Sequence, residues 1–76
     1  MSQHELVEIL THRPFEPFRI HVSDGTVHEI RDPKTMYVGQ TTALVCFPPK
    51  GVPLPAIDRY ETVALFHITQ IEPVNN

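Results

Sequence analysis

Apolar residues near the N-terminus recur with the spacing of a helix: Leu6, Ile9 and Leu10. Ser2 precedes them, and Glu5 follows Ser2 by three positions. This pair is a capping box, in which each side chain accepts a hydrogen bond from a backbone N–H that the first helical turn leaves unpaired. Pro14 ends the pattern, because the residue before a proline is disfavoured in the α region. The spacing therefore predicts a helix over about residues 3–12.

Two runs of alternating apolar and polar residues then predict strands over residues 18–23 and 26–31. Gly25 lies between them and supplies the positive φ that a hairpin turn requires. A two-residue turn would pair apolar positions with charged ones, whereas a three-residue loop places the apolar positions of both runs on one face. Register follows the hydrophobic pattern, so we expect the three-residue loop. His21 and His28 then point to opposite faces of the hairpin.

The second half of the chain predicts three further strands: residues 36–47 with a bend, 59–66 and 70–74. The proline-rich segment 48–55 lacks many of the N–H donors that a sheet needs and is expected to be a loop. Beyond it, the period of two gives way to apolar residues three apart: Leu65, Ile68 and Ile71. A tight turn over residues 67–70 fits this change of period. We expect a mostly β fold with one N-terminal α-helix, and a tail at residues 75–76.

A chain of 76 residues forms one domain, here residues 1–76, near the lower limit for folding on a hydrophobic core alone. Association between copies would add stability to such a domain. The net charge of −3 argues against a broad electrostatic grip on nucleic acid. The N-terminus lacks the apolar core of a signal peptide, and no apolar run approaches the roughly 20 residues of a membrane span. We expect a cytoplasmic protein that does not bind a membrane.

Residue types that carry catalysis or bind metals are scattered along the chain. The single cysteine, Cys46, lies in an apolar run and is predicted to be a small buried hydrophobe. The five histidines show no close ligand spacing, so no metal site is expected. The three glycines form no phosphate-binding loop, and no serine nucleophile signature is present. We therefore expect neither enzymatic activity nor a cofactor.

Two segments, residues 17–25 and 66–73, carry a resemblance to a known family. The first is a proline and an alternating strand that ends in an Asp-Gly turn, and the second places a histidine in a tight turn with a proline soon after it. Together with the order of one capped helix and five strands, they resemble the Sm-like proteins, and the bacterial Hfq branch most closely. The resemblance implies a five-stranded SH3-type small barrel and a homo-oligomer formed by pairing of strand edges.

By the same resemblance, single-stranded RNA is the implied ligand. The RNA-binding candidates lie in the turn and on a basic rim: His67, Thr69, Gln70, Arg19 and Arg31. The candidates for the oligomer interface lie on the strand before the turn: Val63, Leu65 and Phe66. Phe66 stands where the family carries lysine or arginine, so the alternative is a protein-interaction or structural domain that has lost RNA binding. The sequence thus indicates a small non-enzymatic binding module and leaves RNA and protein open as its ligand.

Overall fold

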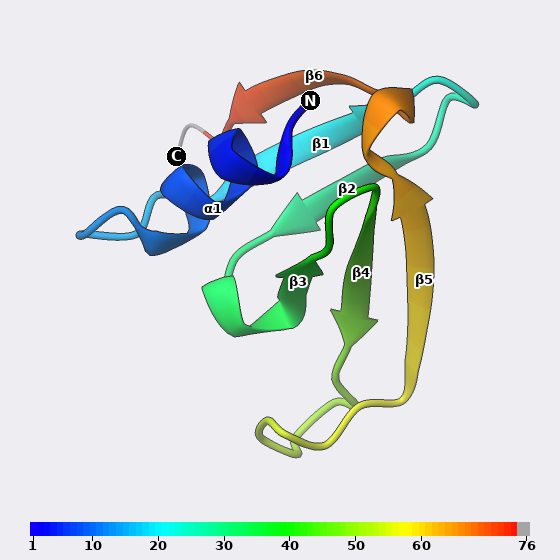
Figure 1. Cartoon of the computed structure of the whole chain (residues 1–76). Helices are drawn as coiled ribbons and strands as arrows, with labels where there is room; N and C mark the ends of the chain where they lie inside the picture. The colour runs from blue at the N-terminus through cyan, green and yellow to red at the C-terminus, as the bar shows by residue number, and fades with distance from the viewer. Residues whose placement is uncertain (75–76) are drawn as a thin grey trace.

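The computed structural model describes residues 1–74 and has one α-helix, six strands and two 3₁₀ turns in that part of the chain (Figure 1). The expected tail at residues 75–76 lies outside the described residues. In chain order the elements are α1 (Gln3–Thr11), β1 (Phe18–Val22), β2 (Val27–Ile30), η1 (Pro33–Thr35), β3 (Met36–Val38), β4 (Thr42–Phe47), β5 (Arg59–Ala64), η2 (Leu65–His67) and β6 (Ile68–Pro73). The strands form two three-stranded sheets. The first sheet has the order β2-β1-β6, and the second sheet has the order β3-β4-β5.

The helix begins where the capping box predicts. The Ser2 hydroxyl accepts a hydrogen bond from the Glu5 amide at 3.2 Å, and the Glu5 carboxylate accepts one from the Ser2 amide at 3.2 Å. At the other end, the Arg13 guanidinium donates to the carbonyls of Leu10 and His12, which α1 leaves without helical partners. Local polar contacts thus define both ends of the helix, and its range lies close to the predicted residues 3–12.

The hairpin between β1 and β2 has the predicted three-residue loop. Ile20 lies opposite His28, and the Val22 amide donates to the Thr26 carbonyl at 2.9 Å to close the loop. Gly25 has a φ of 95°, which a residue with a Cβ rarely adopts. The predicted register is therefore confirmed. Because register fixes which side chains share a face, it also decides where the polar residues of this sheet lie.

The predicted single strand over residues 36–47 is wrong. Two antiparallel strands, β3 and β4, occupy this range, with Met36 opposite Val45 and Val38 opposite Ala43. The chain reverses at Gly39, whose amide donates to the Thr42 carbonyl at 2.7 Å. A Cβ at Gly39 would lie 3.1 Å from that carbonyl oxygen, so a glycine lets the reversal close tightly. The bend predicted within residues 36–47 is thus a full chain reversal that begins at Gly39.

The strand before the C-terminal turn ends earlier than predicted. β5 stops at Ala64, and η2 occupies Leu65–His67, whereas the sequence pattern predicted a strand to residue 66 and a turn over 67–70. β6 correspondingly begins at Ile68 instead of residue 70. Leu65 and Ile68 are both buried, one at the start of η2 and one directly after it. Their three-residue spacing is satisfied by the earlier 3₁₀ turn, where the chain crosses from the second sheet to the first (Figure 1).

One hydrophobic core draws on α1 and on both sheets: Leu6, Leu10, Phe18, Ile20, Ile30, Met36, Ala43, Val45, Val63, Leu65 and Ile68. The mostly β class with one N-terminal helix is therefore confirmed. The two sheets are not closed into a barrel within residues 1–74, so the closed five-stranded barrel is not confirmed. Across the same residues, no helix combines the length and the apolar character needed to cross a membrane.

Candidate functional site

The η2 turn gathers three of the predicted RNA-binding residues at one end of the first sheet. The exposed His67 has its Nδ1 3.0 Å from the Ser23 hydroxyl, and its ring lies 4.2 Å from the Phe66 ring, centroid to centroid. The Thr69 hydroxyl donates to the His21 carbonyl at 3.2 Å, and Gln70 is exposed on β6. Thr69 is thus held by the backbone, while the adjacent Phe66 and His67 residues are exposed to solvent.

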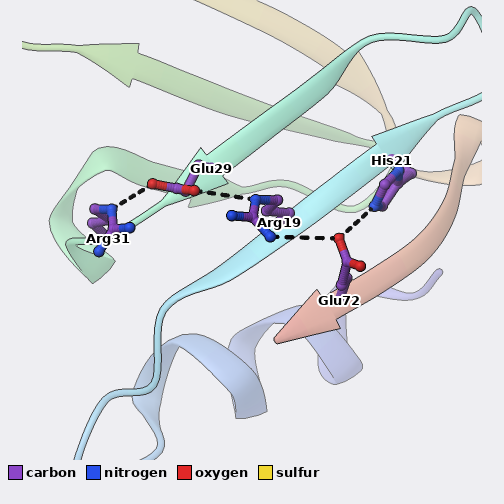
Figure 2. Close-up of polar contacts among 5 residues, drawn as sticks. All are labelled: Arg19, His21, Glu29, Arg31 and Glu72. Atoms are coloured by element: carbon purple, nitrogen blue, oxygen red, sulfur yellow. Dashed lines mark hydrogen bonds and ion pairs between the residues drawn. The ribbon is translucent and has the colours of Figure 1, made fainter. Parts of the chain in front are cut away.

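The two predicted arginines lie elsewhere, in a row of alternating charges on the outer face of the first sheet (Figure 2). Arg19, on the central strand β1, contacts Glu29 on β2 at 3.1 Å and Glu72 on β6 at 3.7 Å. Arg31 contacts the other oxygen of Glu29, and His21 lies 3.1 Å from Glu72. Both arginines are therefore engaged by carboxylates of the same sheet.

This row of charges, which we call the charge ladder (Arg31, Glu29, Arg19, Glu72 and His21), stabilises the ionised form of Glu29. The hydrogen bond from Arg31, together with the positive charges of Arg31 and Arg19, lowers the pKa of Glu29 below its ordinary value. A phosphate that bound to Arg19 or Arg31 would have to displace these carboxylates. The hairpin register predicted from the sequence already places Arg19 opposite Glu29. The ion pair between these two residues could therefore be predicted from the sequence.

The three predicted interface residues divide sharply by exposure. Val63 and Leu65 belong to the core, and Leu65 is only 3% exposed. Their side chains are therefore not available to a second copy, so pairing at these two positions would involve the backbone alone. Phe66 is 76% exposed and is the one member of the three that presents an apolar surface. The reason is the 3₁₀ turn, which directs Leu65 inward and leaves the next residue outside.

A second apolar surface was missed by the sequence reasoning. On the outer face of the second sheet, Tyr37 lies opposite Leu44, and Tyr60 lies opposite Cys46. Both tyrosines are 60% exposed, while Cys46 between them is buried, as predicted. A groove of about 480 Å³ runs over this face, lined by Lys34, Tyr37, Leu44, Cys46, Leu54, Pro55 and Ile57. We call it the tyrosine face: Tyr37, Tyr60, Leu44, Ile57 and the rim residue Lys34.

The proline-rich segment contributes to this groove. It forms a loop, as predicted, and its Leu54 and Pro55 lie over the second sheet as one wall of the groove. Lys34, on η1, is the single charged residue of the lining and makes no ion pair within residues 1–74. Side chains alternate between the two faces of β3 and of β5. Once the reversal at Gly39 is known, this alternation predicts that Tyr37 and Tyr60 lie on the face away from the core.

Comparisons with known proteins return no relative. No protein-family model, curated protein or solved structure matches the chain. Within residues 1–74, no three histidine, cysteine, aspartate or glutamate side chains are grouped closely enough to hold a metal ion.

Proposed function

We propose that the chain is a small non-enzymatic binding module and that its ligand is a protein, bound on the tyrosine face. The observation that carries this proposal is the exposure of Tyr37 and Tyr60 on one face of the second sheet, where Tyr37 lines an apolar groove. Tyrosines are enriched at protein interfaces because they bury a large rigid ring and keep a hydroxyl for hydrogen bonding. The fitting partner is an extended segment with apolar side chains for the groove and one acidic residue for Lys34.

The distribution of charge favours a protein over RNA. Affinity for nucleic acid comes largely from Lys and Arg side chains that neutralise phosphates. Here the net charge is −3, and Arg19 and Arg31 are held by Glu29 and Glu72 in the charge ladder. An apolar groove with one cation at its rim suits a peptide with one carboxylate better than it suits a polyanion.

Selection from a displayed library of random short peptides tests this proposal. We expect peptides enriched on the wild-type chain to combine apolar residues with Asp or Glu, and to lose binding to the variant with Tyr37→Ser and Tyr60→Ser. Val27→Ser is the matched control, because Val27 is an exposed apolar residue on the first sheet. Enrichment that survives both tyrosine substitutions, or no enrichment at all, would contradict a protein ligand on this face.

The strand order favours an Sm-like scaffold as a further part of the proposal. Along the chain, β1 and β2 come first, β3, β4 and β5 then form the second sheet, and η2 leads to β6, which pairs with β1 in the first sheet. β5 and β6 each have one strand neighbour among the described residues, so both offer edges for pairing between copies. Light scattering on the purified chain tests this: a hexamer or heptamer fits edge pairing in a ring, and a monomer contradicts it.

Single-stranded RNA at the η2 turn is the second candidate, and one observation favours it. The exposed Phe66 ring, which lies tilted at 40° against the His67 ring, offers an aromatic face on which a base can stack. In a fluorescence anisotropy titration with short U-rich or A-rich RNA at low salt, Phe66→Ala would then weaken binding by about tenfold, as the loss of one stacked base does. The RNA candidate is excluded if the chain purifies at low salt without excess absorbance at 260 nm and if added RNA shows no saturable change in anisotropy.

A further inference from the structure

The inner faces of the two sheets carry polar residues at one place, where β2 and β5 face each other. His28 shares a face with Ile20, and Glu61 shares a face with Val45, so both polar side chains point toward the core side of their sheets. Nε2 of His28 lies 3.3 Å from Oε2 of Glu61. Among the contacts between a basic side-chain nitrogen and a carboxylate found in residues 1–74, this is the one that joins the two sheets.

Polar residues at these positions are unfavourable for a small domain unless they serve another purpose. His28 is almost covered, with 10% of its side chain exposed, and it lies against the Phe47 ring at 6.0 Å between centroids. An apolar residue there would enlarge a core that is small for a chain of this length. Sequences that violate the apolar pattern at a few inward positions usually do so at functional sites.

A cleft of about 450 Å³ opens beside this pair, between the β1–β2 hairpin and β5, and a cavity of that size accepts a small ligand or one long side chain. Its lining combines aliphatic side chains with carboxylates, hydroxyls and imidazoles and contains no Lys or Arg: Val22, Asp24, Thr26, His28, Glu61, Thr62, Val63, Ala64 and His67. Arg59 lies outside this lining, where it contacts the second Glu61 oxygen at 3.2 Å and covers the Phe47 ring at 4.1 Å.

Two residues that line the cleft, His28 and Asp24, can each accept a further hydrogen bond. Nδ1 of His28 has no hydrogen-bond partner within residues 1–74 and is not fully buried, and His28 is one of the residues that line the cleft. With the proton on Nε2, toward Glu61, Nδ1 is a hydrogen-bond acceptor. Asp24 accepts two hydrogen bonds from Thr26, both at Oδ1, which leaves Oδ2 for a ligand.

We propose that this cleft binds an alkylammonium or alkylguanidinium group. Its aliphatic stem lies along Val22, Val63 and Ala64, and its charged head donates to the His28 Nδ1, to the Asp24 carboxylate and to the cleft hydroxyls. A lysine or arginine side chain of a protein partner and a free aliphatic amine share this chemistry. The site lies on a different surface from the tyrosine face, because the two share no lining residue, and it does not depend on the function proposed for that face.

Nuclear magnetic resonance titration of the intact, isotope-labelled chain tests the proposal. The probes are n-butylammonium, Nα-acetyl-lysine methylamide, and neutral n-butanol as the control for the stem. We expect both ammonium probes to shift the His28 ring signals and the Val63 and Ala64 amides saturably, and n-butanol to have no such effect. A stronger response to the lysine amide identifies a protein side chain as the natural ligand, and equal responses identify a free amine.

Variants separate the site from general effects on folding. Asp24→Asn is expected to weaken ammonium binding by about tenfold or more, the usual result of removing a charged hydrogen-bond partner. His28→Leu is expected to abolish binding and, because Leu suits the inward position, to keep a folded spectrum. His21→Leu is the matched control, since His21 pairs with Glu72 in the charge ladder. Unchanged binding in Asp24→Asn and His28→Leu, or no saturable shift with either ammonium probe, overturns the proposal.

Discussion

Two neighbouring residues in the η2 turn should respond in opposite ways to truncation. Leu65 is 3% exposed and belongs to the core, whereas Phe66 is 76% exposed. Leu65→Ala removes buried methyl groups and leaves a cavity, which costs about 2–5 kcal/mol of unfolding free energy. Phe66→Ala removes a ring that is mostly in water and lies tilted against His67, so a change of at most about 0.5 kcal/mol is expected.

The size of the chain makes the first effect large. A domain of 76 residues has a total unfolding free energy of roughly 4–11 kcal/mol, at 0.05–0.15 kcal/mol per residue. A loss of about 3 kcal/mol would lower the Tm by roughly 12–24 °C, at 4–8 °C for each kcal/mol. Leu65→Ala therefore has a greatly reduced folded population, and Phe66→Ala does not.

Urea unfolding followed by far-ultraviolet circular dichroism measures both variants, because the chain has no tryptophan for a fluorescence assay. Phe66→Ala serves as the control for changes in the turn itself. If Leu65→Ala unfolds at the wild-type urea concentration, Leu65 does not lie in the core. If Phe66→Ala is the more destabilised variant, the position of the 3₁₀ turn is wrong by one residue.

Three further predictions concern the helix, the charge ladder and the cysteine. Ser2→Ala removes the cap of α1 and should cost about 1 kcal/mol in urea unfolding, with Ser2→Asp close to wild type. The lowered pKa of Glu29 contributes stability that is complete above its unfolded pKa and is lost as the pH falls through its lower folded pKa. Thermal melts between pH 7 and pH 3 should therefore show a shallower acid loss in Glu29→Gln, and an equally steep loss would contradict the ladder. Cys46 should react with a disulfide reagent far more slowly in buffer than in urea, because it is buried, and equal rates would show that it is exposed.

Local patterns in the sequence predicted the elements whose contacts are themselves local. The cap of α1 depends on residues three positions apart, and the hairpin register depends on two adjacent runs with a glycine between them. Both are correct in the structure. The general class, mostly β with one helix, follows from these elements and from the alternation in the second half.

The errors occur where one pattern fits two arrangements. Residues 36–47 alternate equally well as one bent strand or as a hairpin, and only the close approach of Gly39 to Thr42 distinguishes them. Apolar residues three apart allow a turn at residues 65–67 or at 67–70, and burial of both Leu65 and Ile68 selects the first. A shift of two residues then moves Leu65 from a predicted interface into the core.

The candidate surfaces were harder to predict because they join segments that are distant in sequence. The charge ladder needs β6 beside β1, the tyrosine face needs β3, β5 and the proline-rich loop together, and the cleft needs β2 opposite β5. No local spacing contains this information. Of the predicted RNA-binding residues, the structure brings His67, Thr69 and Gln70 near the η2 turn and places Arg19 and Arg31 in the ladder.

The position at which a selected peptide binds tests the central proposal most directly. We expect titration of the isotope-labelled chain with such a peptide to shift backbone amides of β3, β4 and the loop before β5, around Tyr37 and Tyr60. The amides of η2 and of the charge ladder should remain unshifted. Shifts that instead centre on Phe66 and His67, with the tyrosine face unaffected, would contradict a protein-binding tyrosine face and move the functional surface to the η2 turn.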